Sequence, residues 1–173
     1  MDTLISRAMA RHHVYLCIGG NLGDRAANLA ETRMFLEFNV GDIEGESPIV
    51  ESPAWQMEDS PPFLNQVIRI ATDLEPQELM QEIAELEAFY GRRRVTGSYV
   101  DREMDVDVLS YDQQVSEEPA WYVPHPRLHL RRFVLVPLAA LDPEWRHPAL
   151  NRTAAELLEV CDDPSPVSIY ASA

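Results

Sequence analysis

Two carboxylates lie close together in a stretch of the chain that otherwise has the pattern of a buried strand. The segment DREMDVDVLSY (residues 101–111) contains Asp105 and Asp107. Side chains two residues apart in a strand point to the same face, so these acids would share a face with Leu109 and Tyr111, about 6 to 7 Å from one another. Unpaired carboxylates at that distance repel each other, and an apolar face strengthens the repulsion. The pattern therefore predicts a positive group beside them.

Two interpretations of this acidic pair are open from its residues alone. The acids could be solvated charges on an edge strand, where they would discourage pairing with another sheet. They could instead hold Mg²⁺, which prefers oxygen ligands and is commonly bound by one or two carboxylates together with substrate phosphates. His125, which follows Pro124 in a short predicted loop, could donate to a phosphate or could simply face solvent.

The basic residues favour anion binding by guanidinium groups. All 14 are arginines and lysine is absent, which excludes a Walker-type lysine and a Schiff-base lysine. Arginine forks suit the bidentate recognition of phosphates. Arg92 to Arg94 follow a predicted helix, whose C-terminal dipole would stabilise cations without any function. Half of the basic residues lie within 91–133: Arg92, Arg93, Arg94, Arg102, Arg127, Arg131 and Arg132.

Composition narrows the class of protein. With 173 residues, 46% of them hydrophobic, the chain can form one domain with a core, and we expect it over 14–173 after a disordered tail at 1–13. The net charge of -15 argues against nucleic acid as a partner. The sequence contains no apolar run of about 20 residues and no secretory pattern, so we expect a cytoplasmic protein away from membranes. Cys17 and Cys161 lack metal-ligand spacing, and we expect reduced thiols.

The elements that must position the acids and arginines follow one another in a recognisable order. Periodicity and turn residues predict two helices, over 21–38 and 75–90. The predicted strands are 14–20, a β-rich stretch within 46–55, 63–72 and the acidic strand within 101–111. The order strand, helix, strand, strand, helix, strand predicts an α+β sandwich of ferredoxin-like type, with a mainly antiparallel sheet and flanking helices. An apolar helical run after residue 131 and a short helix near 152–160 follow.

Several segments in this order resemble the 6-hydroxymethyl-7,8-dihydropterin pyrophosphokinase family of folate biosynthesis. DREMDVDVL is similar to the family signature, in which an arginine precedes an acidic, apolar, acidic triplet. The other similar segments, over residues 14 to about 148, are VYLCIGGNLGD, ESPAW, FLNQV, GRRR and VPHPRLHLRRFVLVPLAAL. The set is specific, although each segment alone would be a weak signal.

The resemblance implies roles for residues on the nucleotide side of a site. Asp105 and Asp107 would bind two Mg²⁺ ions that bridge ATP to the protein. Arg92 and Arg102 match arginines that stabilise the reacting phosphates. The positions that would contact ATP are Arg94, His125 and Arg131.

The resemblance also implies the pterin side of that site. Phe63 and Phe133 would stack on the two faces of the pterin, although core packing would be the simpler interpretation of these rings without the resemblance. Asn65 would hydrogen-bond the pterin edge. The loop whose backbone recognises the ring would include Ser52, Pro53 and Trp55.

The implied reaction is attack by the pterin hydroxymethyl oxygen on the β-phosphorus of ATP, with AMP as leaving group, in a monomeric enzyme whose partners are these small molecules. The chain departs from the family pattern in three places: Val100-Asp101 replaces Gly-Pro, Tyr99 replaces tryptophan, and GGN replaces Gly-Ser-Asn. A non-catalytic pterin-binding relative and a different Mg²⁺-dependent phosphotransferase on the same fold are the alternatives.

Overall fold

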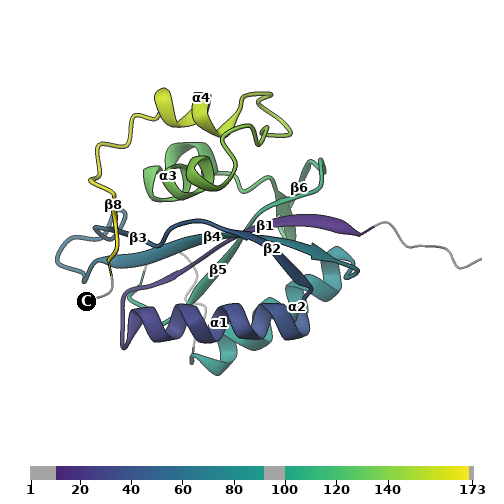
Figure 1. Cartoon of the computed structure of the whole chain (residues 1–173), viewed down its shortest axis with the longest axis horizontal. Coiled ribbons are helices and arrows are strands. Elements are labelled where there is room, and N and C mark those ends of the chain that lie inside the picture. The colour runs from purple at the N-terminus through teal and green to yellow at the C-terminus, as the bar shows by residue number, and fades with distance from the viewer. Residues whose placement is uncertain (1–10, 92–99, 172–173) are drawn as a thin grey trace, which may run out of the picture.

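The computed structural model describes residues 11–91 and 100–171. Its helices α1 and α2 cover one face of a central sheet, and α3 and α4 cover the other, as Figure 1 shows. Within the described ranges, no helix is both long enough and apolar enough to cross a membrane. The predicted α+β class is confirmed.

The central sheet joins six strands among the described residues, in the order β5-β1-β4-β3-β8 with β2 also paired to β4. The pairings of β1, β2, β3 and β8 are antiparallel. Their bounds are β1 His12–Gly20, β2 Asp42–Glu46, β3 Val50–Ser52, β4 Phe63–Thr72, β5 Asp105–Tyr111 and β8 Ser168–Ile169. β1 thus begins two residues before the predicted strand.

The β-rich stretch predicted within 46–55 is divided between two strands, β2 and β3. Ser47 separates them, because its N–H donates to the carbonyl oxygen of Val67 at 2.9 Å while its Oγ accepts the Val67 N–H at 2.9 Å. Pro48 then lacks the N–H that a continuous ladder would need. Both pieces lie against β4, so the predicted topology is preserved.

The helices begin and end where local chemistry directs them. α1 (Arg25–Asn39) is capped by Asp24, whose Oδ1 accepts the N–H of Ala27 at 3.0 Å. α2 (Pro76–Phe89) begins at a proline, and Gly91 follows it with a φ of 72°. The other helices are α3 (Arg132–Leu141) and α4 (Ala154–Glu159), and a small hairpin is formed by β6 (Ser116–Glu118) and β7 (Trp121–Val123).

Alternation along the strands divides the core into two layers. On β1, Leu16 and Ile18 pack toward α1 and α2, whereas Tyr15 and Cys17 pack toward α3. A bulge on β5 changes this alternation, since the register with β1 shifts between Tyr15 and Leu16. Tyr111 therefore packs in the layer of α1 and α2, and the prediction that it shares a face with Asp105, Asp107 and Leu109 is wrong.

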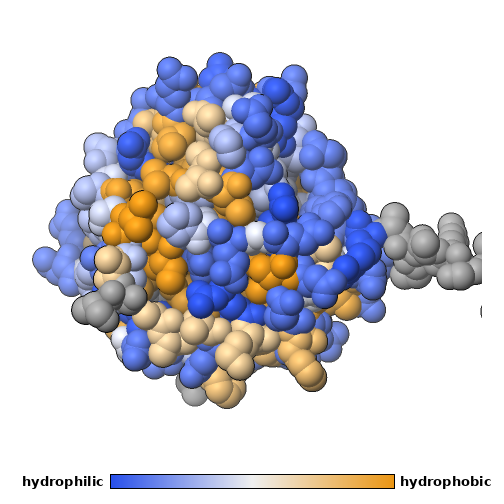
Figure 2. Space-filling model, in the orientation of Figure 1, coloured by the Kyte–Doolittle hydropathy of each residue, from blue (hydrophilic) through white to orange (hydrophobic). Residues whose placement is uncertain are grey.

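The solvent face of α1 carries apolar side chains. Leu29 and Leu36 are fully buried against the sheet, while Met34 and Phe38 are 73% and 90% exposed. Figure 2 shows pale to orange residues along the lower edge of the molecule, where α1 lies in Figure 1. The apolar residues of α1 are thus not confined to its buried stripe.

Candidate functional site

A cavity of about 240 Å³ opens where β1, β3, β4 and β5 meet the loops around them. The predicted site residues that line it come from segments far apart in sequence: Ser52, Pro53, Trp55, Phe63, Asn65, Arg102, Asp105, Asp107, His125, Arg131 and Phe133. Every predicted site residue in the described part of the chain is therefore in this one pocket. The remaining two, Arg92 and Arg94, lie outside the described residues.

Each carboxylate of the acidic strand has an arginine beside it. Nη1 of Arg102 lies 3.1 Å from Oδ2 of Asp105, and Nη1 of Arg131 lies 3.4 Å from Oδ2 of Asp107. The prediction of a positive group beside the two acids is thus confirmed, and the groups are arginines. β5 is at the edge of the described sheet, but its two acids face the pocket, so the edge-strand interpretation explains the position of β5 and not these side chains.

Arg131 is a buried cation held between aromatic rings. Only 5% of the residue is exposed, and its guanidinium carbon lies 4.7 Å from the ring centre of Trp55 and 5.6 Å from that of Phe133. A buried charge is costly unless it is paired, and here Asp107 and the two ring faces compensate it. The contact joins the loop that carries Trp55 to the start of α3.

His125 is a neutral hydrogen-bond donor directed at the acids. Its backbone N–H donates to the carbonyl oxygen of Leu109 at 2.9 Å, and its ring Nδ1 accepts the backbone N–H of Arg127 at 3.1 Å. The ring proton is therefore on Nε2, which lies 3.9 Å from Oδ2 of Asp107. Burial, followed by the charges of Arg131 and Arg127, lowers the pKa of His125 to about 4. The imidazole can donate to an anion without carrying charge.

The opposite wall of the pocket is aromatic and contains one buried amide. Phe63 begins β4, and the guanidinium carbon of Arg102 lies 6.0 Å from its ring centre. Asn65, two residues along the same strand, is 5% exposed and lies over Gly19 of β1, where an added Cβ would come within 2.0 Å of the Asn65 Oδ1. A glycine at position 19 is thus required by the position of the amide.

The pocket also contains residues for which the sequence suggested no role: Cys17, Gly19, Met57 and Arg127. Cys17 and Gly19 are opposite Asp107 and Asp105 in the register of β1 with β5, so strand alternation was the signal for both. Burial, with the charges of Asp107 and Asp105, raises the pKa of the Cys17 thiol. That thiol stays protonated, 4.0 Å from the Oδ1 of Asn65.

A second cavity of about 220 Å³ adjoins the first between α2, β5 and the β6–β7 hairpin. The two cavities share Asp107 and His125. Its further lining is mostly apolar or aromatic and includes Met80, Ile83 and Tyr122. A ligand that contacts Asp107 and His125 is therefore next to both cavities.

Comparison with known proteins finds relatives that act on pterins or in folic acid synthesis, as their names state. The sequence profile of the 7,8-dihydro-6-hydroxymethylpterin-pyrophosphokinase (HPPK) family matches residues 15–143. The 2-amino-4-hydroxy-6-hydroxymethyldihydropteridine pyrophosphokinase of Aquifex aeolicus is 36% identical over 143 residues, which are 83% of this chain and 88% of that protein. The Folic acid synthesis protein FOL1 of Dictyostelium discoideum is 32% identical over 140 residues, covering 81% of this chain and 21% of that one.

A solved structure supports the fold. The wild-type HPPK-DHPS of Plasmodium falciparum, crystallised with pteroate, superposes with a TM-score of 0.67 at 13% identity, over 86% of this chain and 44% of that chain. The chain thus spans less than half of that longer protein. With the family profile and the curated relatives, the pocket leads to one assignment: this chain belongs to the 7,8-dihydro-6-hydroxymethylpterin-pyrophosphokinase family, the pyrophosphokinases of folate biosynthesis.

Proposed function

We propose that the pocket holds the hydroxymethyl pterin against its aromatic wall and Mg·ATP against its acidic and basic wall. The family reaction, pyrophosphate transfer with ATP as co-substrate, is then carried out where the two walls meet. The observation that carries the proposal is that Phe63 and Asn65 line the same cavity as Asp105 and Arg102. An acceptor alcohol and a phosphate donor could be bound side by side there.

On the pterin side, the support is aromatic and polar. Phe63 and Phe133 both line the cavity and would stack on a flat heteroaromatic ring. The buried amide of Asn65 would hydrogen-bond the edge of the ring. Ser52, Pro53 and Trp55 would close this side through the loop that follows β3. This wall would select the pterin and present its hydroxymethyl group to the acids.

The acids of β5 fit magnesium as it is bound with a nucleotide. In the described part of the chain, no three His, Cys, Asp or Glu side chains cluster closely enough to hold a metal by themselves. Two neighbouring carboxylates suit Mg²⁺, which takes its other oxygens from phosphates and water. Asp105 and Asp107 would hold two such ions, which would neutralise charge on the phosphates when bound. Arg102 and Arg131 would then be released from the carboxylates to contact phosphate oxygens.

The second cavity supports a position for the nucleoside of ATP. It shares Asp107 and His125 with the first, so a triphosphate that contacts these residues would bring its base near Met80, Ile83 and Tyr122. The Nε2 proton of His125 would be directed at the phosphates. Arg92 and Arg94, which belong to this side by resemblance, are outside the described residues.

In the reaction, the pterin hydroxymethyl oxygen loses its proton to solvent and forms a bond to the β-phosphorus, while the bond from that phosphorus to the α-phosphate oxygen breaks. AMP leaves, and the pterin keeps the β- and γ-phosphates as a diphosphate. Arg102 would stabilise charge on the transferred group, and the packed aromatic wall would align the alcohol. Phosphoryl-type transfers depend mainly on positioning and charge neutralisation, which these residues can supply.

The products test this proposal. Protein, Mg·ATP and 6-hydroxymethyl-7,8-dihydropterin are mixed and followed by ³¹P NMR, with a matched sample containing EDTA. AMP should appear in step with the pterin diphosphate, and only in the sample with magnesium. ADP with a pterin monophosphate would make the protein an ordinary kinase. Tight pterin binding without turnover would identify a non-catalytic relative.

We also propose that the protein is a cytoplasmic monomer. Its two cysteines, Cys17 and Cys161, are both free, as expected in a reducing compartment. Cell fractionation and sedimentation velocity test the two statements separately. A stable dimer at micromolar concentration would contradict the second.

A further inference from the structure

We propose that Asn21 and Asp101 are positioning residues that fix Arg102 in the pocket by tying the turn after β1 to the loops on both sides of the site. The observation is a hydrogen-bonded cluster around the Asn21 side chain. Neither Asn21 nor Asp101 is among the residues that line the cavity. Their effect on the reaction would act through Arg102.

Asn21 is buried, 3% exposed, and its amide group contacts both loops. Its Nδ2 donates to the Oδ1 of Asp101 at 2.7 Å and to the carbonyl oxygen of Pro61 at 3.1 Å. Its Oδ1 accepts the N–H of Arg102 at 2.8 Å. The three partners are 40 to 81 residues away in sequence. One side chain thus connects the pterin-side loop with the segment that carries Arg102.

The backbone around Asn21 holds the same segment from a second direction. The N–H groups of Asn21 and Leu22 donate to the carbonyl oxygen of Arg102 at 2.9 and 3.2 Å. Gly20 lets β1 approach the segment before β5 this closely, because a Cβ on it would lie 2.1 Å from the carbonyl oxygen of Glu103. Both the N–H and the C=O of Arg102 are therefore engaged, which leaves its side chain as the part directed at the pocket.

The held guanidinium touches both walls of the site. Nη1 of Arg102 lies 3.1 Å from Oδ2 of Asp105, and its guanidinium carbon lies 6.0 Å from the ring centre of Phe63. Its Nε donates to the carbonyl oxygen of Val100 at 3.1 Å. A shift of this backbone would move the guanidinium away from the metal-side carboxylate and the pterin-side ring together. Misplacement of about 1 Å is enough to cost a large factor in rate.

The hydrogen bond from Asn21 also holds the Asp101 carboxylate away from the phosphate-binding arginine. That carboxylate is next in sequence to the proposed phosphate-binding arginine and would compete with phosphate for it if it were free to turn. In the structure its Oδ1 accepts a hydrogen bond from the buried amide instead. Asp101 can therefore stand beside the site without weakening it, and its carboxylate becomes one of the groups that order the loop.

The inference rests on the proposed role of Arg102, and the experiment keeps the two apart. Steady-state kinetics are measured for Asp101→Ala, Asp101→Asn, Asn21→Ala, Arg102→Ala and the double variant of Asp101→Ala with Arg102→Ala. Glu58→Ala is the matched control, because it removes an exposed acid from the loop on the other side of the pocket. Thermal unfolding is followed for each variant.

Asp101→Ala should lower kcat about tenfold while KM for the pterin changes less than about threefold, since one hydrogen bond to a charged group is lost. Asn21→Ala should lower kcat further. Asp101→Asn should keep kcat within about threefold of the wild type, because its side-chain oxygen can still accept from Asn21. Glu58→Ala should behave as wild type. In the Arg102→Ala background, Asp101→Ala should produce no additional loss.

Wild-type kcat in Asp101→Ala would overturn the inference, and so would a further tenfold loss in the Arg102→Ala background. If Arg102→Ala itself keeps full turnover, Arg102 does not stabilise the transferred group. The proposed function of this arginine is then wrong, as well as the inference that Asn21 and Asp101 position it. Asn21→Ala removes three hydrogen bonds from a buried site and could unfold. The exposed Asp101 variants carry the test in that case.

Discussion

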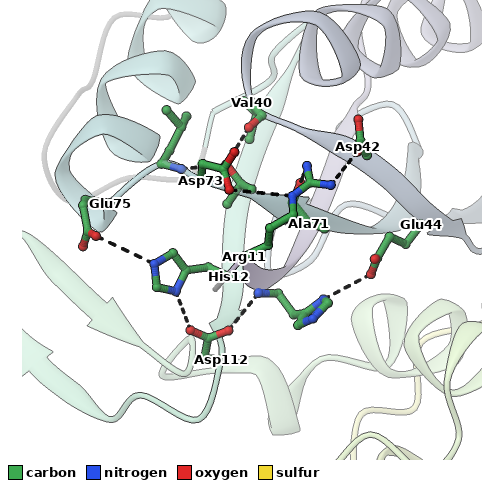
Figure 3. A network of polar contacts seen from close by, with 12 residues as sticks. Arg11, His12, Val40, Asp42, Glu44, Ala71, Asp73, Glu75 and Asp112 are labelled. Carbon is green, nitrogen blue, oxygen red and sulfur yellow. Dashed lines mark hydrogen bonds and ion pairs between the residues drawn. The ribbon is translucent and has the colours of Figure 1, made fainter. Parts of the chain in front are cut away.

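The two ends of β1 both bring opposite charges together, but in different surroundings. At the His12 end, Arg11 pairs with Asp42 and Asp73, and His12 lies between Asp112 and Glu75, as Figure 3 shows. The side chain of Arg11, the arginine of this end, is 41% exposed, and that of its partner Asp42 is 70% exposed. At the Gly20 end, the side chains of the paired arginines, Arg102 and Arg131, are only 14% and 6% exposed.

The exposure of the side chains shows that water stabilises the charges at the His12 end, whereas the protein itself must stabilise those at the Gly20 end. Exposed ion pairs contribute little to stability, because water screens them and ordering the side chains costs entropy. Burying an ion pair carries a desolvation cost that the attraction often fails to offset. Stability alone therefore does not explain why Arg131 and Asp107 are held in the pocket. The proposed binding of a phosphate-bearing ligand would explain it.

The largest expected effect is loss of turnover at the Gly20 end. Asp105→Asn and Asp107→Asn should each lower kcat about a hundredfold to a thousandfold, because each removes a charge that would hold magnesium. Added magnesium should not restore the rate. Asp107→Asn should also lower the free energy of unfolding by about 2 kcal/mol, since it weakens the partner of the buried Arg131. Steady-state kinetics and urea unfolding measure the two effects.

Near-normal turnover of either variant at saturating magnesium would remove the acids from the mechanism. The ion pairs at the Gly20 end would then be structural, and function would not explain why they are less exposed than those at the His12 end. Equal stability loss in both variants would indicate that the exposure of the partner arginine does not matter.

A smaller effect is expected from crowding the buried amide. Gly19→Ala should raise KM for the pterin about tenfold, because the new Cβ would displace the Asn65 side chain. It would also lie 2.7 Å from the carbonyl oxygen of Leu64, so overpacking should cost about 1 to 3 kcal/mol of stability. Gly45→Ala is the control on the same sheet. Its Cβ would meet the flexible end of Leu141 at 2.9 Å and the Arg69 guanidinium at 4.0 Å, and no part of the pocket, so pterin KM should not change. Equal pterin KM in both variants would contradict the assigned role of Asn65.

Much of this organisation could be predicted because it depends on local pattern. The alternation of Asp105 and Asp107 places both on one face whatever the partner strand is, and the pocket contains both. Pro76 and Gly91 bound α2 as their backbone preferences require. The predicted order of elements followed from such signals, and with it the ferredoxin-like arrangement.

The features that escaped prediction depend on contacts between distant segments. The bulge that turns Tyr111 to the other face is set by the register with β1, and the break at Ser47 by its pairing with Val67. The contacts of Asn21 were not predicted: Asp24 caps α1, and the Asn21 side chain reaches two other loops instead. Its partners, Pro61 and Asp101, are 40 and 80 residues away, beyond the reach of any local pattern.

The smallest effect is expected at the His12 end, where Arg11→Ala removes an exposed cation from the network of Figure 3. Its guanidinium also donates to the carbonyl oxygen of Ala71 at 2.8 Å, in a partly buried hydrogen bond that water can replace, since the Arg11 side chain is 41% exposed. The melting temperature should fall by no more than about 3 °C, and the difference from wild type should shrink further in 1 M NaCl. Turnover should be unchanged. Differential scanning calorimetry at low and high salt, with Arg11→Lys as the charge-preserving control, measures the effect. A fall in kcat would show that the two ends of β1 are coupled, and a loss of stability as large as that of Asp107→Asn would show that exposure does not distinguish them.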